Sequence, residues 1–350
     1  MENLNPKSTH RRNFLSTAAV TTAGAGVLAA QRTSGATLPQ QDGEPHQRLP
    51  REVRIATVSQ ANIQEATAAA MTKRVMRELN EIAKQAPDIV CLPETHTAKV
   101  RDYPRHSEIT EATYLSALEP YAYYAKKHRC YVVCPIHTTE NGKCYNSAVF
   151  LDREGDVLGR YHKKHTTTNE MSKGVSPGPA QAPVFDTDFG KVGAQICFDI
   201  HWTDGWQDLS AQGAEIVFWP SAFGGGEMVR TMAWQHQYCV VSSTWKGASR
   251  ICDVTGNELA KTGLWNQWAV ATVNLEREFL HTWPYVRCFG EILAKYGSKI
   301  RIENHEEEEW SIIESRSADL RIDEVMHEFE LKSLRDHLAE ATAMQDKLRS

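Results

Sequence analysis

Val192-Gly193-Ala194-Gln195-Ile196-Cys197-Phe198-Asp199 is the stretch of sequence that decides the fold. Residues 192–196 are mostly apolar and predict a short buried strand that ends at Cys197. The polar, turn-like segment Phe198-Asp199-Ile200-His201-Trp202 follows, and we expect a helix from there to about Gln212. A thiol between the end of a strand and the start of a helix lies where backbone N–H groups converge. This position favours a thiolate and can stabilise an oxyanion.

The segments on either side of this stretch alternate between strand and helix patterns. We expect strands at residues 53–58, 88–92, 130–134, 215–219 and 239–244, and helices at residues 66–85, 114–128 and 228–238. A β-hairpin is expected at residues 145–152 and 157–161, and further strands at residues 249–254 and 268–275. This alternation predicts a layered α/β fold in which helices cover the sheet.

The first 36 residues differ in character from the rest of the chain. Arg11-Arg12 is followed by Phe14-Leu15 and then by a weakly hydrophobic run at residues 16–30 that is rich in Ala, Gly and Thr. Ser34-Gly35-Ala36 offers small residues at a cleavage site. The pattern resembles a twin-arginine export signal, and a disordered basic tail is the alternative. We therefore expect residues 1–36 to be a signal peptide and the mature protein to be periplasmic or extracellular.

Composition limits the class of partner and the number of domains. The 350 residues are 41% hydrophobic and carry a formal charge of −5, which gives no reason to expect nucleic acid as a partner. No stretch is apolar and long enough for a stable membrane span. We expect a linker at residues 37–50, one catalytic domain at residues 51–300 and an acidic C-terminal extension at residues 301–350.

The C-terminal extension holds much of the acidity. Residues 303–350 carry 14 acidic and six basic side chains, and Glu306-Glu307-Glu308-Glu309 is expected to be a solvated charge run. An apolar stripe at helical spacing begins after Asp323 and predicts a terminal helix that packs on the body or on a second subunit. The stripe consists of Val325, Phe329, Leu334, Leu338, Ala341 and Leu348.

Eight cysteines offer neither a small disulfide framework nor the spacing of a zinc site. They lie at positions 91, 130, 134, 144, 197, 239, 252 and 288. Several fall inside apolar runs, which predicts buried free thiols, although an exported protein could pair some of them.

Two further segments place a charged side chain at the end of an expected strand. Glu94 follows Leu92-Pro93, and a partly desolvated carboxylate there can act as a general base, although a lone glutamate is usually a cap or a surface charge. Lys163 follows the hairpin, where its charge can stabilise an oxyanion, although paired lysines are usually solvated. His162 and His165 have no further ligand at suitable spacing, so we expect no metal site.

These three segments, in the order Glu94, Lys163, Cys197, resemble the core motifs of the carbon–nitrogen hydrolase family, also called the nitrilase superfamily. That family has a strand ending in Pro-Glu, a Tyr-Arg-Lys-x-His-like segment, and a strand ending in Cys before a short aromatic and acidic run. The resemblance covers about residues 53–275, and His162 departs from it because arginine is common there. The supporting matches are Tyr145-Asn146-Ser147-Ala148, Trp219-Pro220-Ser221-Ala222-Phe223 and residues 249–260.

The resemblance implies a four-layer α-β-β-α sandwich with a single catalytic domain. It also implies a Cys197 nucleophile with Glu94 as base, and an oxyanion stabilised by Lys163 and the backbone N–H of Phe198. Glu170, seven residues beyond Lys163, matches a second glutamate that many members place near the lysine. No metal or organic cofactor is needed for this chemistry.

The expected activity is hydrolysis of a non-peptide C–N bond in a small-molecule amide or N-carbamoyl substrate through a thioester. A nitrilase is less favoured because that subgroup has Trp-Glu after the cysteine, where this chain has Phe198-Asp199. A catalytically silent binding protein on the same fold is the alternative from another class. The resemblance also implies a homodimer or larger homo-oligomer. Four aromatic residues could line a pocket or belong to the core: Trp202, Trp206, Phe223 and Trp245.

Overall fold

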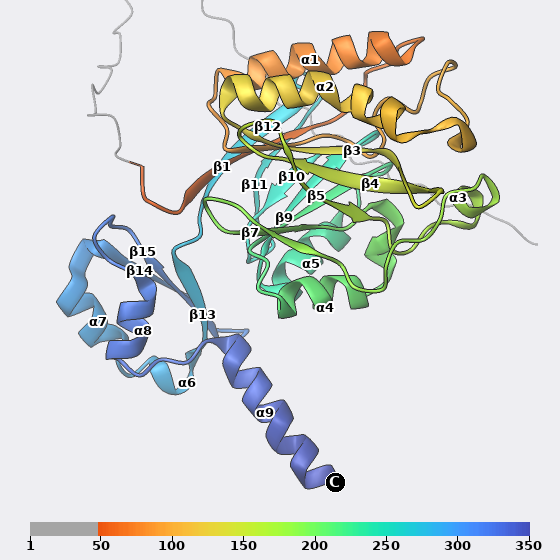
Figure 1. The fold of residues 1–350 in the computed structure, drawn as a ribbon. Helices are drawn as coiled ribbons and strands as arrows, with labels where there is room; N and C mark the ends of the chain where they lie inside the picture. The colour runs from red at the N-terminus through yellow and green to blue at the C-terminus, as the bar shows by residue number, and fades with distance from the viewer. Residues whose placement is uncertain (1–47) are drawn as a thin grey trace, which may run out of the picture. The chain divides into compact units, whose positions relative to one another are not determined.

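Two six-stranded sheets form the centre of the structure, a computed structural model that describes residues 48–350 (Figure 1). The predicted signal peptide and most of the predicted linker lie outside the described residues. In spatial order, the first sheet consists of β12 (Trp268–Asn274), β1 (Glu52–Val58), β2 (Ile89–Cys91), β3 (Tyr131–Glu140), β4 (Lys143–Leu151) and β5 (Val157–His162). The second consists of β11 (Glu258–Lys261), β10 (Arg250–Cys252), β9 (Cys239–Thr244), β8 (Ile216–Ser221), β7 (Lys191–Ala194) and β6 (Val184–Asp186).

Helices cover the outer face of each sheet. Figure 1 shows α1 (Ala68–Ala83) and α2 (Glu111–His128) over the first sheet, and α4 (Asp204–Ala211) and α5 (Glu227–His236) over the second. The predicted α-β-β-α sandwich is therefore confirmed. The short helices η1 (His106–Glu108) and α3 (Thr168–Ser172) lie in connections between strands.

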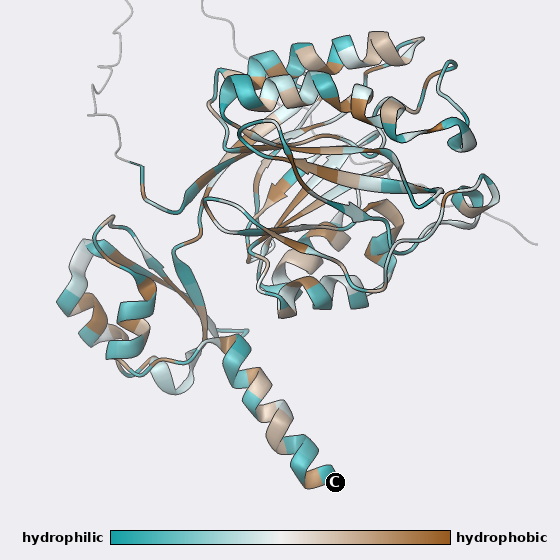
Figure 2. Ribbon diagram, viewed as in Figure 1, coloured by the Kyte–Doolittle hydropathy of each residue, from teal (hydrophilic) through white to brown (hydrophobic). Residues whose placement is uncertain are grey.

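The layers follow from where the apolar side chains point. Side chains alternate between the two faces of a strand and recur on one face of a helix. Along β2 and the residue after it, Ile89 and Cys91 point into the core between the sheets, whereas Val90 and Leu92 pack under α1 and α2. Helix α1 buries one apolar stripe, and the Thr67 hydroxyl caps its N-terminus. Figure 2 shows this pattern as hydrophobic strands between helices with hydrophilic outer faces.

The direction of the strands brings one edge of both sheets together. Strands β1, β2 and β3 are parallel, as are β7, β8 and β9, so within each set the carboxyl ends share an edge. The ends of β1 and β9 meet in a parallel bridge between Ser59 and Thr244. Buried hydroxyls link the sheets there: Thr57 Oγ1 donates to the Ser242 carbonyl at 2.6 Å, and Ser243 Oγ donates to that of Cys91 at 3.1 Å.

The C-terminal residues build a third, smaller sheet with its own apolar core. Its strands are β13 (Arg277–His281), β15 (Trp310–Ser315) and β14 (Ile300–His305), with α6 (Thr282–Tyr285), α7 (Phe289–Tyr296), η3 (Gly297–Lys299) and α8 (Ile322–Glu328) around them. The predicted charge run at residues 306–309 is exposed in the connection between β14 and β15. The domain boundary at residue 300 stays a prediction; β13, which precedes it, pairs with β15, which follows it.

Two predicted helices differ from the structure. The residues after Cys197 form a short 3₁₀ helix, η2 (Cys197–His201), before α4, because Trp202 is extended between them. The C-terminal stripe is divided between α8 and α9 (Leu334–Arg349), because Glu330 takes a left-handed conformation and the Ser333 side chain starts a new helix. Within residues 48–350, no helix has the length and apolarity needed to cross a membrane.

Candidate active site

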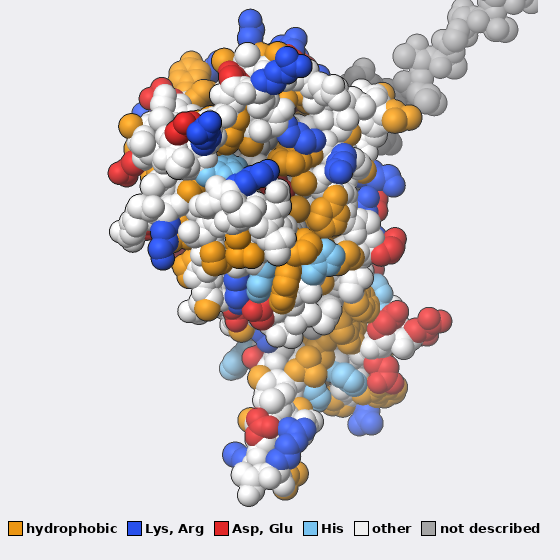
Figure 3. Space-filling view, turned by 90° about the vertical axis from the view of Figure 1, so that its right-hand side faces the viewer, with side chains coloured by type: hydrophobic (Ala, Val, Ile, Leu, Met, Phe, Trp, Pro, Cys, Tyr) orange, Lys and Arg blue, Asp and Glu red, His pale blue; other side chains and the backbone are white. Residues whose placement is uncertain are grey.

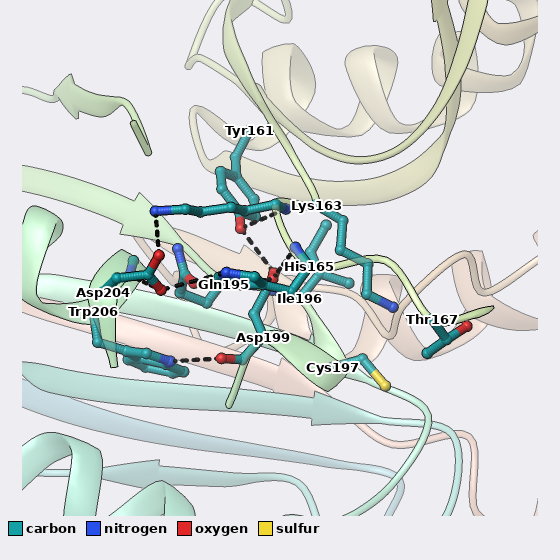
Figure 4. Close-up of polar contacts among 12 residues, drawn as sticks. Tyr161, Lys163, His165, Thr167, Gln195, Ile196, Cys197, Asp199, Asp204 and Trp206 are labelled. Atoms are coloured by element: carbon teal, nitrogen blue, oxygen red, sulfur yellow. Dashed lines mark hydrogen bonds and ion pairs between the residues drawn. The ribbon is translucent and has the colours of Figure 1, made fainter. Parts of the chain in front are cut away.

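The three residues predicted to be catalytic lie at the edge where the carboxyl ends of the strands meet. Glu94 follows β2, Lys163 follows β5 directly, and Cys197 opens η2 just after β7. All three are buried, with exposed fractions of 4% for Glu94, 1% for Lys163 and 8% for Cys197. In Figure 4, the Lys163 ammonium and the Cys197 sulfur point to the same side.

Lys163 is the centre of an ionic network. Its Nζ lies 3.2 Å from Glu94 Oε1, and 3.0 and 2.9 Å from the two carboxylate oxygens of Glu170. Asn146 Nδ2 donates to Oε1 of both glutamates, at 2.8 and 2.9 Å. Burial alone would lower the pKa of Lys163, but the charges of Glu94, Cys197 and Glu170 raise it above its ordinary value. The site therefore holds a permanent positive charge that water screens little.

Glu170 is positioned by its own short helix. It is the third residue of α3, and its carboxylate accepts hydrogen bonds from the backbone N–H of Thr167 at 2.8 Å and from the Thr167 hydroxyl at 2.9 Å. This capping box fixes the carboxylate against Lys163. Burial raises the pKa of Glu170, but Lys163 and the hydrogen bonds from Asn146 and Thr167 outweigh it and lower the pKa to about 2. The predicted proximity of Glu170 to Lys163 agrees with this geometry, whereas its supporting role in catalysis stays a prediction.

The low pKa of Glu170 links stability to pH. Because the folded-state pKa is below the ordinary value of 4.5, the carboxylate stabilises the protein above that value, and the stabilisation is lost as the pH falls toward 2. The full effect is about 3 kcal/mol. We expect Glu170→Gln to lower the free energy of unfolding at pH 7 and to flatten its fall between about pH 5 and pH 2. Urea unfolding at a series of pH values across this range measures the free energy of unfolding, and Glu119→Gln at an exposed position is the control. If the free energy of unfolding falls with pH equally steeply in the wild type and in Glu170→Gln, the prediction is wrong.

Cys197 occupies a strained position at the end of the strand. Its φ is +48°, a left-handed conformation that few non-glycine residues adopt and that is common at functional sites. Trp219 Nε1 donates to the Cys197 carbonyl at 3.0 Å and holds this turn. Burial and then the Glu94 carboxylate raise the pKa of the thiol to about 12, while Lys163, the Ala222 N–H and the Ser221 hydroxyl act in the opposite direction. Burial therefore opposes the thiolate that the strand-end position was expected to favour, and the sulfur needs a base before it can attack.

Asp199 anchors the turn that carries Cys197. It is fully buried and accepts hydrogen bonds from the backbone N–H groups of Ile196 at 2.8 Å and His165 at 2.7 Å, and from the Tyr161 hydroxyl at 2.7 Å (Figure 4). One carboxylate therefore ties the cysteine turn to the lysine segment. The N–H of Phe198 lies in the first turn of η2, where N–H groups have no acceptor within the helix. Its predicted role toward an oxyanion stays a prediction.

Aromatic rings surround the cysteine turn. Trp202 is 40% exposed and stacks on His165 with ring centroids 4.5 Å apart, and Phe198 contacts Trp202 edge to face. His201 stacks on Phe223. Figure 3 shows hydrophobic side chains and histidines gathered on the face seen there. Of the other two aromatic residues considered from the sequence, Trp206 is buried in the core and Trp245 is half-buried.

The sequence did not reveal the roles of Asn146 and Asp199 in the site. Asn146 belonged to a motif of the family resemblance, but nothing in its local pattern shows that one amide contacts two glutamates distant in sequence. The sequence identifies Asp199 only as the acidic residue that follows the cysteine motif. Its local signal is the spacing of three residues from Ile196, which allows a side chain to bond back to the backbone N–H.

The family model described as carbon-nitrogen hydrolase matches residues 55–285. The chain belongs to this family. A citrullinase from Francisella tularensis is 26% identical over 171 residues, which are 40% of this chain and 59% of the relative. An N-carbamoylputrescine amidase from Solanum lycopersicum is 34% identical over 98 residues, which are 27% of this chain and 33% of the relative. The matched segments thus span less than two thirds of these curated relatives.

Solved structures agree on the fold. The crystal structure of an amidase from Nesterenkonia sp. superimposes with a TM-score of 0.58 at 17% identity, covering 65% of this chain and 92% of the amidase chain. At this identity the likeness shows the fold alone, and it is the sandwich predicted from the sequence.

Proposed function

We propose that this member of the carbon–nitrogen hydrolase family hydrolyses an amide or N-carbamoyl group of a small molecule, with Cys197 as nucleophile. The observation that carries the proposal is the buried Lys163 ammonium, held between Glu94 and Glu170 and acting electrostatically on the Cys197 thiol. A nucleophile, a carboxylate base and a fixed positive charge are the groups that acyl transfer requires. The names of the citrullinase and the N-carbamoylputrescine amidase support a carbamoyl substrate.

The chemistry follows from the positions of these groups. Glu94 takes the proton of Cys197, and the sulfur bonds to the carbonyl carbon as the charge on the oxygen is stabilised by Lys163 and the Phe198 N–H. The C–N bond then breaks, and Glu94 returns the proton to the leaving ammonia or amine. Glu94 next takes a proton from water, and the water oxygen bonds to the thioester carbon. The C–S bond then breaks, the acid leaves, and Glu94 returns the proton to the Cys197 sulfur. Glu170 and Asn146 hold Lys163 and Glu94 in place.

Glu94→Gln tests the base directly. We expect the variant to lower kcat by about 10²- to 10⁴-fold on a panel of amides, N-carbamoyl amino acids and nitriles, with ammonia release as the measurement. The same change should lower the pKa of Cys197, because the Glu94 carboxylate raises it. The pH dependence of thiol alkylation measures that pKa. Full turnover by the variant, or a wild type that releases ammonia from nothing on the panel, would reject the proposal.

We propose that the protein is exported by the twin-arginine pathway to the periplasm or the exterior. The Arg11-Arg12 pair, the following Phe14-Leu15 and the weakly apolar run support it. A reporter fused to residues 1–40 should lose its periplasmic signal on Arg11→Lys/Arg12→Lys, and an unchanged signal would reject this route.

We also propose that the protein forms a homodimer or a larger homo-oligomer. In α9, Leu334 is buried, whereas Leu338, Met344 and Leu348 are 52%, 59% and 87% exposed. Light scattering of the full chain and of Leu338→Glu/Leu348→Glu measures this, and a monomeric wild type would reject it.

A further inference from the structure

A cavity of about 450 Å³ lies beside the loop that carries Glu94. Trp245 connects the cavity to this loop. It lines the cavity, and its indole N–H donates to the backbone carbonyl of Glu94. Lys99 lies five residues after Glu94 on the same loop, and Lys246 follows Trp245 directly. Lys99, Lys246 and Glu65 are charged residues of the lining.

The cavity concentrates positive charge. Lys99 Nζ lies 4.6 Å from the centroid of the Trp245 ring. Burial and then the like charge of Lys246 lower the pKa of Lys99, so the two ammonium groups act on each other. Within residues 48–350 neither forms an ion pair with a carboxylate, whereas Lys164 and Lys261 do. Among the lining residues that lie within the described part of the chain, Glu65 is the one acidic residue against two lysines, so their net charge is positive.

We propose that Lys99 and Lys246 bind the carboxylate of an anionic substrate, so that the protein acts on an amide or N-carbamoyl derivative of an amino acid. This inference rests on the proposed function and names its substrate class. Both lysines are exposed, and an anion bound by them relieves the repulsion between two ammonium groups that pair with no carboxylate within residues 48–350. Because Trp245 both lines the cavity and donates to the Glu94 carbonyl, its ring can contact the carbon chain of a substrate that reaches from the lysines toward Cys197. The turn at residues 197–202 holds no lysine or arginine, so it offers no such anchor.

Two ureido substrates that differ in charge test the proposal. N-carbamoyl-β-alanine carries a carboxylate, whereas N-butylurea has the same ureido group on an uncharged chain. Each of Lys99→Gln and Lys246→Gln should raise KM for N-carbamoyl-β-alanine about fivefold, and the double variant by about the product of these factors. Neither should change kcat for it or kcat/KM for N-butylurea by more than about twofold. Lys73→Gln removes the same charge from an exposed position on α1 and should change neither substrate.

The outcomes separate the subsite from the activity. Equal losses for both substrates, or no loss in the double variant, would overturn the subsite and leave the hydrolase proposal in place. If the wild type releases no ammonia from any substrate, the hydrolase proposal fails. Calorimetry of N-carbamoyl-β-alanine with Cys197→Ala then decides the subsite alone. Binding that weakens when Lys99→Gln and Lys246→Gln are added supports it, and unchanged or absent binding rejects it.

Discussion

Replacing Cys197 by alanine is expected to lower kcat by at least about 10⁴-fold. The sulfur forms the covalent bond in the proposed mechanism, and Cys197 is the cysteine whose thiol pKa the Glu94 carboxylate raises and the Lys163 ammonium lowers. Ammonia release in steady state, on whichever amide or carbamoyl substrate the wild type accepts, measures the effect.

Cys288→Ala is the matched control for this variant. Cys288 is half-buried near the start of α7, so the same sulfur is removed with no change near Glu94. We expect wild-type turnover from it. If Cys197→Ala keeps a rate of the same order as the wild type, while folded by circular dichroism, Cys197 is not the nucleophile.

Replacing Lys163 by methionine should destabilise the fold as well as abolish turnover. The ammonium is the countercharge of Glu94 and Glu170, and its loss leaves two carboxylates close together in a site with little water. Removing one partner of a buried ion pair costs about 3–5 kcal/mol. We expect a loss of this size in the free energy of unfolding, measured in urea at pH 7, and partial recovery in Lys163→Met/Glu170→Gln, in which one carboxylate is neutral.

Lys164→Met tests whether the lysine position has been assigned correctly. Lys164 pairs with Asp204 at 2.8 Å and with Asp208 at 3.5 Å, two half-exposed carboxylates. Such pairs contribute about 0–1 kcal/mol, so this variant should keep its activity and most of its stability. Loss of turnover in Lys164→Met with retention in Lys163→Met would contradict the assignment.

The sequence predicted the layered fold because each layer has a local signal. Alternation in β2 sends Cys91 toward the inter-sheet core and Val90 toward the helices, and both faces are apolar, as expected for a strand buried on two sides. The prediction of one terminal helix from the C-terminal apolar stripe was wrong. Apolar spacing alone does not reveal that Glu330 takes a left-handed conformation and that Ser333 caps a new helix.

The catalytic candidates were predictable because each stands at a strand end, but their environment was not. The position of Asn146 between Glu94 and Glu170 depends on the β3–β4–β5 pairing, in which Lys163 N–H donates to the Asn146 carbonyl. The contact of Lys99 with Trp245 joins the loop after β2 to the residue that follows β9 in the other sheet. Contacts between sheets depend on how the layers pack, which no local pattern encodes.

The thioester at Cys197 is the central claim, and mass spectrometry of the acid-quenched enzyme tests it most directly. Wild-type protein is mixed rapidly with an amide substrate that it turns over, quenched, digested and mapped. The account predicts an acyl group on the peptide that contains Cys197 and none on that peptide in Cys197→Ala. Turnover with the acyl group on another residue would contradict it.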